Sequence, residues 1–130
     1  MDDGGIEGTT RLLRRIPPQW RVPDGEGGLR PASGAFQDVR DETGTKALSV
    51  YIETVLRLSG LTPEDVIDGM PGYGLVAFTA ERARELGLGV VTAPRDDQGP
   101  IGVAHAHVFG KKTGAIQGAL ARDCDRVIWP

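Results

Sequence analysis

The chain has 130 residues, of which 39% are hydrophobic and 25% charged, with a formal net charge of −3. This is the size and composition of one globular domain, and the negative charge excludes a general basic field, so nucleic acid is not an expected partner. No apolar run approaches the roughly 20 residues that span a bilayer, and a single cysteine excludes an internal disulfide. Together these features predict a cytoplasmic protein without membrane association.

The N-terminal third is poor in regular pattern. Residues 1–10 hold glycine, acidic residues and little apolar surface, so we expect a disordered leader there. RLLRRI, residues 11–16, has the apolar spacing of a short strand, which two prolines then end. A stretch rich in glycine and proline at about 17–47 is predicted to be one long irregular loop, and loops of this length are often functional.

Two helices are predicted next. In LSVYIETVLRLSG, residues 48–60, apolar residues recur at helical spacing, Ser49 suits the N-cap and Gly60 suits the position after the helix. The alternative is a strand through residues 48–52, because Val, Tyr and Ile favour strands. LTPEDV then opens the second helix, with Thr62 as its cap and proline at the first helical position.

Beyond residue 70 the hydrophobic pattern alternates between short elements. Strands are predicted at 73–79, 88–94, 101–110 and 127–130, and helices at 80–87, capped by Thr79, and at 113–127. This order predicts an α+β fold: a single compact domain at 11–130, with a small mixed sheet packed with three to four helices. The alternative, a doubly wound parallel sheet, lacks both the regular alternation and the glycine-rich first turn.

The stretch GVAHAHVFGKKTG, residues 102–114, holds both histidines of the chain. On a strand His105 and His107 point to the same face and could clamp zinc or iron, but such a site needs further ligands, which the nearby sequence does not offer. We therefore predict no metal. We expect the two rings on the less buried face of the strand, opposite Ala106 and Val108.

The same stretch is similar to the end of a nucleotide-binding P-loop, but the match is incomplete. His105 stands where the first glycine is required, and Lys112 separates Lys111 from Thr113. A weaker interpretation is that Thr113 caps the last helix, whose free N–H groups attract anions, and that the lysines add charge beside it. Lys111, Lys112 and Thr113 thus form a candidate anion-binding site. The alternative is that both lysines are solvated surface charges.

Other polar residues could serve a cleft. On a strand Arg14 and Arg15 lie on opposite faces, and one guanidinium could bind a phosphate or carboxylate. RPASGAF adds Arg30 and Ser33 within the long loop. No serine stands in a nucleophile elbow, and Cys124 is expected to be a small buried residue rather than a nucleophile.

The segments LLRRIPPQW, RPASGAF, LSVYIE, GYGLVAFTAERARELGLGVV and AHAHVFGKKT resemble an uncharacterised family of small bacterial proteins. A fainter resemblance is to ADP-ribosyltransferase-like proteins, including RES-domain toxins that consume NAD. That resemblance implies that Arg14 or Arg15, Ser33 and Glu53 take the roles of the family's arginine, serine and catalytic glutamate. The family's glycine-rich GGRW-type segment is absent from this chain.

Two functions follow as alternatives. The first is a cytoplasmic accessory or protein-interaction domain of a bacterial defence or toxin-related system, with a protein partner and no cofactor, acting through the 17–47 loop and the end near Lys111. The second is a small nucleotide-directed enzyme with NAD as substrate. Its candidate catalytic residues would have to line one cleft: Arg14, Arg15, Ser33, Glu53 and His107. The sequence does not indicate an oligomeric state.

Overall fold

A computed structural model describes residues 1–41 and 44–130. The strands are β1 (Arg11–Ile16), β2 (Arg21–Pro23), β3 (Leu29–Pro31), β4 (Val39–Arg40), β5 (Lys46–Ile52), β6 (Gly74–Thr79), β7 (Gly89–Thr92), β8 (His105–Phe109) and β9 (Asp125–Ile128). The α-helices are α1 (Glu53–Leu58), α2 (Pro63–Val66), α3 (Ala80–Glu85) and α4 (Gly114–Asp123), and the 3-10 helices are η1 (Pro18–Trp20), η2 (Ser33–Phe36) and η3 (Asp96–Ala104). The predicted α+β class and single domain are confirmed.

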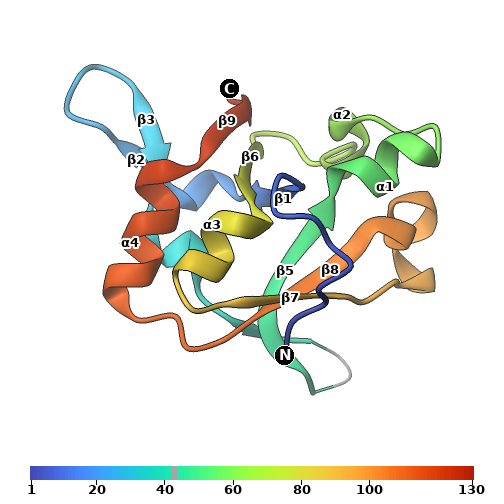
Figure 1. Cartoon of the computed structure of the whole chain (residues 1–130). Helices are drawn as coiled ribbons and strands as arrows, with labels where there is room; N and C mark the ends of the chain where they lie inside the picture. Colours follow the sequence, from blue (N-terminus) through green and yellow to red (C-terminus); the bar gives the residue numbers. More distant parts are fainter. Residues whose placement is uncertain (42–43) are drawn as a thin grey trace.

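Seven of the strands form one sheet. Its order is β7-β8-β5-β1-β6-β9, with β4 paired to the beginning of β5. Every pairing between described strands is antiparallel, and β1 lies between β5 and β6 near the centre. Strands β2 and β3 form a separate hairpin, which projects from the body of the molecule close to α4 (Figure 1).

Both faces of the sheet are buried. Opposite residues of antiparallel strands share a face. The Leu12–Phe78 pair therefore lies on the face covered by α3, α4 and η2, whereas the Leu13–Tyr51 pair lies on the face covered by α1, α2 and η3. Strand β6 accordingly contacts apolar neighbours on both sides, and it reads as a continuous apolar run in the sequence.

The helix predicted from residue 49 is wrong in its first half. Strand β5 continues to Ile52, and α1 begins only at Glu53. The backbone of Val50 and Tyr51 pairs with β8, and that of Tyr51 and Ile52 with β1. Two-sided burial explains why their apolar pattern could also be fitted to a helix. The turn expected at Gly60 is found, with a φ of +76° there.

Several local predictions are confirmed. Thr62 and Asp65 form a reciprocal capping box at the start of α2, and the Thr79 and Thr113 hydroxyls accept from the first turns of α3 and α4. Two elements are shorter than predicted. Helix α4 ends at Asp123, and the strand expected from residue 101 begins at His105, because η3 occupies the preceding residues.

The structure differs from the expected disordered leader. Ile6 is buried in the core cluster that also contains Ala80 and Ala83 of α3, and the Asp3 amide donates to the Val90 carbonyl at 2.7 Å. The Arg84 guanidinium reaches the Asp2 carboxylate at 3.1 Å and the Ile6 carbonyl at 2.7 Å. One apolar side chain and a set of charged contacts therefore hold a segment whose composition alone indicates disorder.

The segment expected to be one irregular loop at 17–47 contains regular structure. It holds the β2–β3 hairpin, the turns η1 and η2, β4 and the start of β5; residues 42–43 lie outside the description. Phe36 is fully buried, and the Trp129 indole donates to the Leu29 carbonyl at 2.9 Å. These long-range contacts fix the segment, and periodicity within the segment could not reveal them.

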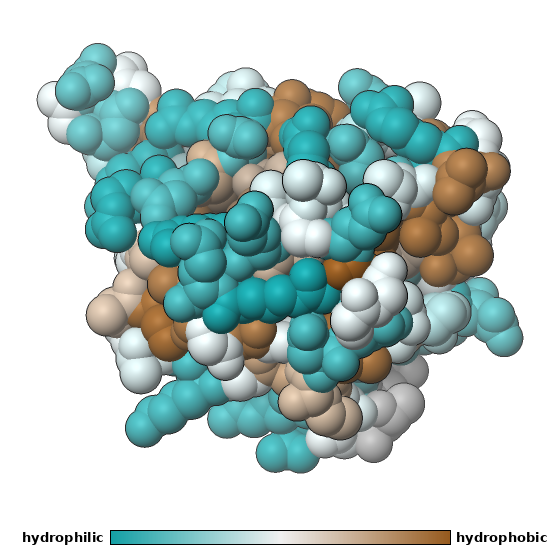
Figure 2. Space-filling view, in the orientation of Figure 1, coloured by the Kyte–Doolittle hydropathy of each residue, from teal (hydrophilic) through white to brown (hydrophobic). Residues whose placement is uncertain are grey.

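The surface is largely hydrophilic in the view of Figure 2, with a hydrophobic patch over α1. Leu58, at the end of α1, is 89% exposed. No helix formed by the described residues is long and apolar enough to cross a bilayer.

Candidate functional site

The two histidines form part of a buried aromatic row, not a solvent-facing site as expected. His105 is 1% exposed and His107 9% exposed. Their rings pack edge to face at a centroid distance of 5.0 Å, with Tyr51 beyond His105 at 5.5 Å and Phe109 beyond His107 at 5.6 Å. The prediction was wrong because both faces of β8 are covered, so neither face is the less buried one.

Burial disfavours the protonated form of both rings. The His105 Nδ1 lies 2.8 Å from the Ala93 carbonyl and donates to it, while its Nε2 is buried without a hydrogen-bond partner among the described residues. Desolvation lowers the pKa of His105 and of His107, although Asp41, 3.5 Å from the His107 Nε2, works in the other direction. No group of three or more metal-ligating side chains occurs among the described residues.

The candidate anion site at the start of α4 is changed by the position of Lys112. Its side chain is 2% exposed, and its ammonium lies 2.7 Å from the Asp38 carboxylate and 2.7 and 2.8 Å from the Val108 and Gly110 carbonyls. Three acceptors already satisfy its three donors. The expectation of a solvated lysine is therefore wrong for Lys112. Lys111 is exposed, and Thr113 caps the helix.

The proposed catalytic residues occupy separate places. The Arg14 guanidinium lies on the α4 side of the sheet, where it donates to the Ala35 and Ser49 carbonyls at 3.0–3.1 Å, and burial lowers its pKa to about 10. Glu53 begins α1, and its carboxylate contacts Arg11 at 3.6 Å and Arg57 at 3.7 Å. Each of these charges therefore has a structural partner.

The remaining candidates are no closer to a common cleft. Arg15 lies on the opposite face of β1 from Arg14 and lines a hollow beside α2 and η3. His107 belongs to the buried row, and Ser33 lines a different hollow, against α4. The structure does not bring the five residues together, so it does not assemble the cleft that the nucleotide-directed alternative requires.

Ser33 belongs to a hollow of about 420 Å³ that we call the arginine hollow. Three guanidinium groups line it: Arg30 from β3, Arg122 from α4 and Arg126 from β9. In Figure 2 hydrophilic side chains dominate the surface over the β2–β3 hairpin at its edge. The sequence pointed to Arg30 and Ser33 only as loop residues. Arg122 and Arg126 carried no signal, because the fold alone brings α4 and β9 beside the hairpin.

The arginines of this hollow have weak internal partners. Arg30 donates to the neighbouring Pro31 carbonyl at 3.2 Å, and Arg122 lies 3.5 Å from the adjacent Asp123. The Arg126 guanidinium lies over the Trp129 ring, with its central carbon 5.4 Å from the ring centroid. Exposed contacts of this kind contribute little, so the positive charge remains available to a ligand.

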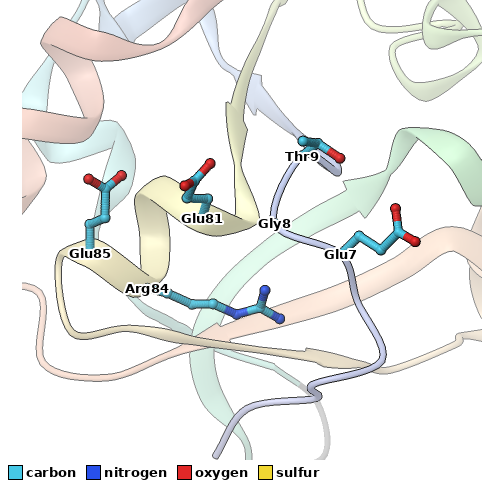
Figure 3. Close-up of a pocket in the computed structure, with 6 residues that line it drawn as sticks. All are labelled: Glu7, Gly8, Thr9, Glu81, Arg84 and Glu85. Carbon is cyan, nitrogen blue, oxygen red and sulfur yellow. The ribbon is translucent and has the colours of Figure 1, made fainter.

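A larger hollow, of about 700 Å³, lies between the leader and α3. Figure 3 shows Arg84 extending beneath the leader, whereas Glu81 and Glu85 point the other way. Glu7, Glu81 and Glu85 give this hollow an acidic lining. Arg84, the one cationic residue that lines it, has a structural role, because its guanidinium donates to Asp2, Asp3 and Ile6.

Of the hollows described above, the arginine hollow alone gathers several cations with weak internal partners among the described residues. No protein-family model, curated protein or solved structure matches the chain.

Proposed function

We propose that the protein is a small, non-enzymatic accessory domain that binds an acidic segment of a protein partner in the arginine hollow. The observation that carries this proposal is the convergence of Arg30, Arg122 and Arg126, from three separate elements, around Ser33. Three like charges in one hollow repel one another, and a bound carboxylate-rich segment removes that repulsion while accepting bidentate hydrogen bonds.

Two acidic side chains that interact with these arginines, Asp24 and Asp123, do not neutralise this charge fully. The Asp24 carboxylate accepts from the Glu26 and Gly28 amides of its own turn, at 2.7 and 3.1 Å, and these bonds lower its pKa more than Arg126 does. Asp123 forms a shorter contact, of 2.8 Å, with Arg82 on α3. Both carboxylates are thus committed elsewhere, so an incoming acidic group would meet arginine donors.

A protein segment suits this hollow better than a nucleotide does. Its lining residues include no aromatic ring against which a base could stack. The scatter of the candidate catalytic residues also favours a binding role, without a cofactor, over turnover of NAD. A cytoplasmic location is part of the proposal, because a chain with one free cysteine, Cys124, and no internal disulfide suits a reducing compartment.

The test uses fluorescence anisotropy with a labelled oligoglutamate peptide. We expect saturable binding that weakens as salt is added, and a loss of at least about tenfold in affinity when Arg30, Arg122 and Arg126 are all changed to Gln.

The matched control changes three exposed cations elsewhere to Gln: Arg40, Lys46 and Arg57. It alters the net charge equally and should keep most of the binding. Equal weakening by the two triple variants, or no saturable binding by the wild-type protein, would overturn the proposal.

A further inference from the structure

We propose a second binding site, independent of the arginine hollow, for a small monocarboxylate with a compact apolar body. It lies in a hollow of about 330 Å³ between the end of β1, the α2 region and η3. The three segments come from widely separated parts of the sequence. Arg15 and Gln98 supply its hydrogen-bond donors, and Leu61, Met70 and Ile101 supply apolar walls.

The Arg15 guanidinium is held in a fixed position. Its Nε donates to the Val66 carbonyl at 2.7 Å, and its central carbon lies 4.9 Å from the centroid of the Tyr51 ring. Tyr51 is itself 3% exposed, so the ring is a rigid support. One edge and one face of the guanidinium are therefore engaged, which fixes the direction of its two terminal nitrogens.

Those terminal nitrogens are available to a ligand. Neither Nη atom of Arg15 has a hydrogen-bond or ion-pair partner among the described residues. Both atoms are also absent from the set of buried polar atoms without a partner, so they are not buried. Because both atoms remain accessible and Arg15 lines the hollow, their N–H groups form the fork that binds a carboxylate through two parallel hydrogen bonds.

Gln98 adds a second donor from η3. Its Oε1 accepts from the Tyr51 hydroxyl, so the orientation of the amide group is fixed. Its Nε2 has no hydrogen-bond partner among the described residues and is not buried, so it can donate to a ligand. The same tyrosine thus positions the guanidinium with its ring and the amide with its hydroxyl.

The remaining residues of the hollow define the ligand further. A volume near 330 Å³ is at the small end for ligand sites, which favours a compact molecule. Asp65 is engaged in the capping box with Thr62, whereas the Asp68 carboxylate is exposed and has no partner among the described residues. A second negative charge on the ligand would meet Asp68, so dicarboxylates and phosphates are disfavoured relative to a monocarboxylate.

The experiment is an NMR titration of the ¹⁵N-labelled full chain with benzoate, with benzamide as the neutral analogue of the same shape. We expect saturable shifts in the millimolar range at Leu61, Met70 and Ile101, and none of that kind with benzamide. Gln98→Glu keeps the acceptor for the Tyr51 hydroxyl but places a negative charge beside the carboxylate. It should weaken benzoate binding by about tenfold or more, equivalent to about 1.4 kcal/mol.

The matched control is Arg122→Gln, which changes the net charge by the same amount but lies in the arginine hollow. It should leave benzoate binding unchanged. If Gln98→Glu does not give the spectrum of a folded protein, Arg15→Lys replaces it, because that change keeps the charge and removes the fork. Equal shifts with benzamide, shifts centred on Arg30 and Arg122, or no saturation would overturn the proposal, whatever the outcome with oligoglutamate.

Discussion

Lys111 and Lys112 are adjacent in the sequence but should respond very differently to mutation. Lys112→Ala removes a side chain that is 2% exposed and whose ammonium has three acceptors within 2.8 Å, including the Asp38 carboxylate, whose side chain is 19% exposed. Breaking a fully buried ion pair costs about 3–5 kcal/mol because one charge is left without compensation. Since Asp38 keeps some access to water, we expect a loss near the lower end, about 3 kcal/mol.

Lys111→Ala is the matched comparison. Lys111 is exposed and is not seen to contact a partner among the described residues, so its removal should change the free energy of unfolding by no more than about 0.5 kcal/mol. Urea unfolding followed by circular dichroism measures the free energy of unfolding of both variants. The double change of Lys112→Ala with Asp38→Asn should cost less than the sum of the single changes, because the carboxylate charge left by the first change is then absent.

The reasoning is refuted if the two lysine variants unfold at the same urea concentration, or if the double variant loses the full sum. Either result would mean that Lys112 is solvated in solution, as the sequence alone suggested. The anion site with Lys111 and Thr113 would then regain its second cation.

Three further outcomes are expected. The free energy of unfolding should fall from pH 7 to pH 5: unfolded histidines, with a pKa near 6.5, take up protons that burial withholds from His105 and His107, by at most about 1.4 kcal/mol per pH unit for each. His105→Gln should reduce this dependence of the free energy of unfolding on pH, measured by urea titrations at several pH values. An unchanged dependence would contradict a lowered pKa for His105. Thr113→Ala should lower the free energy of unfolding by about 1 kcal/mol because the helix cap is lost. A melting temperature equal to that of the wild type would contradict this role of Thr113. Ile6→Ala should cost about 2 kcal/mol, and no loss would show the leader to be undocked.

Local chemistry predicted the parts of the fold that depend on adjacent residues. Thr62, Thr79 and Thr113 cap helices at the predicted positions. A cap depends only on a threonine hydroxyl and the free backbone N–H groups of the next few residues, so it can be predicted from adjacent sequence. Strand β6 was equally recognisable as an apolar run between turn residues. The predicted class follows from these elements, since their order alone excludes regular βα alternation.

Contacts between distant segments account for what the sequence could not reveal. Residues 48–52 fit a helix or a strand until the partners β1 and β8 are known. Lys112 looks like a surface residue until Asp38, far away in the chain, is placed beside it. The same holds for the candidate sites: Arg122 and Arg126 become relevant only when α4 and β9 come to lie beside the β2–β3 hairpin.

The contacts of the leader with Val90 have a consequence for the behaviour of the protein at high concentration. β7 is the last strand on its side of the sheet, and the outward-facing amide and carbonyl of Val90 are taken up by the Asp2 carboxylate at 2.9 Å and the Asp3 amide at 2.7 Å. An open strand edge is a template on which another molecule can add a strand, and such edges promote aggregation. The first residues of the chain therefore cover the edge of β7 and oppose self-association. Their removal would expose an unpaired strand edge on an otherwise folded molecule.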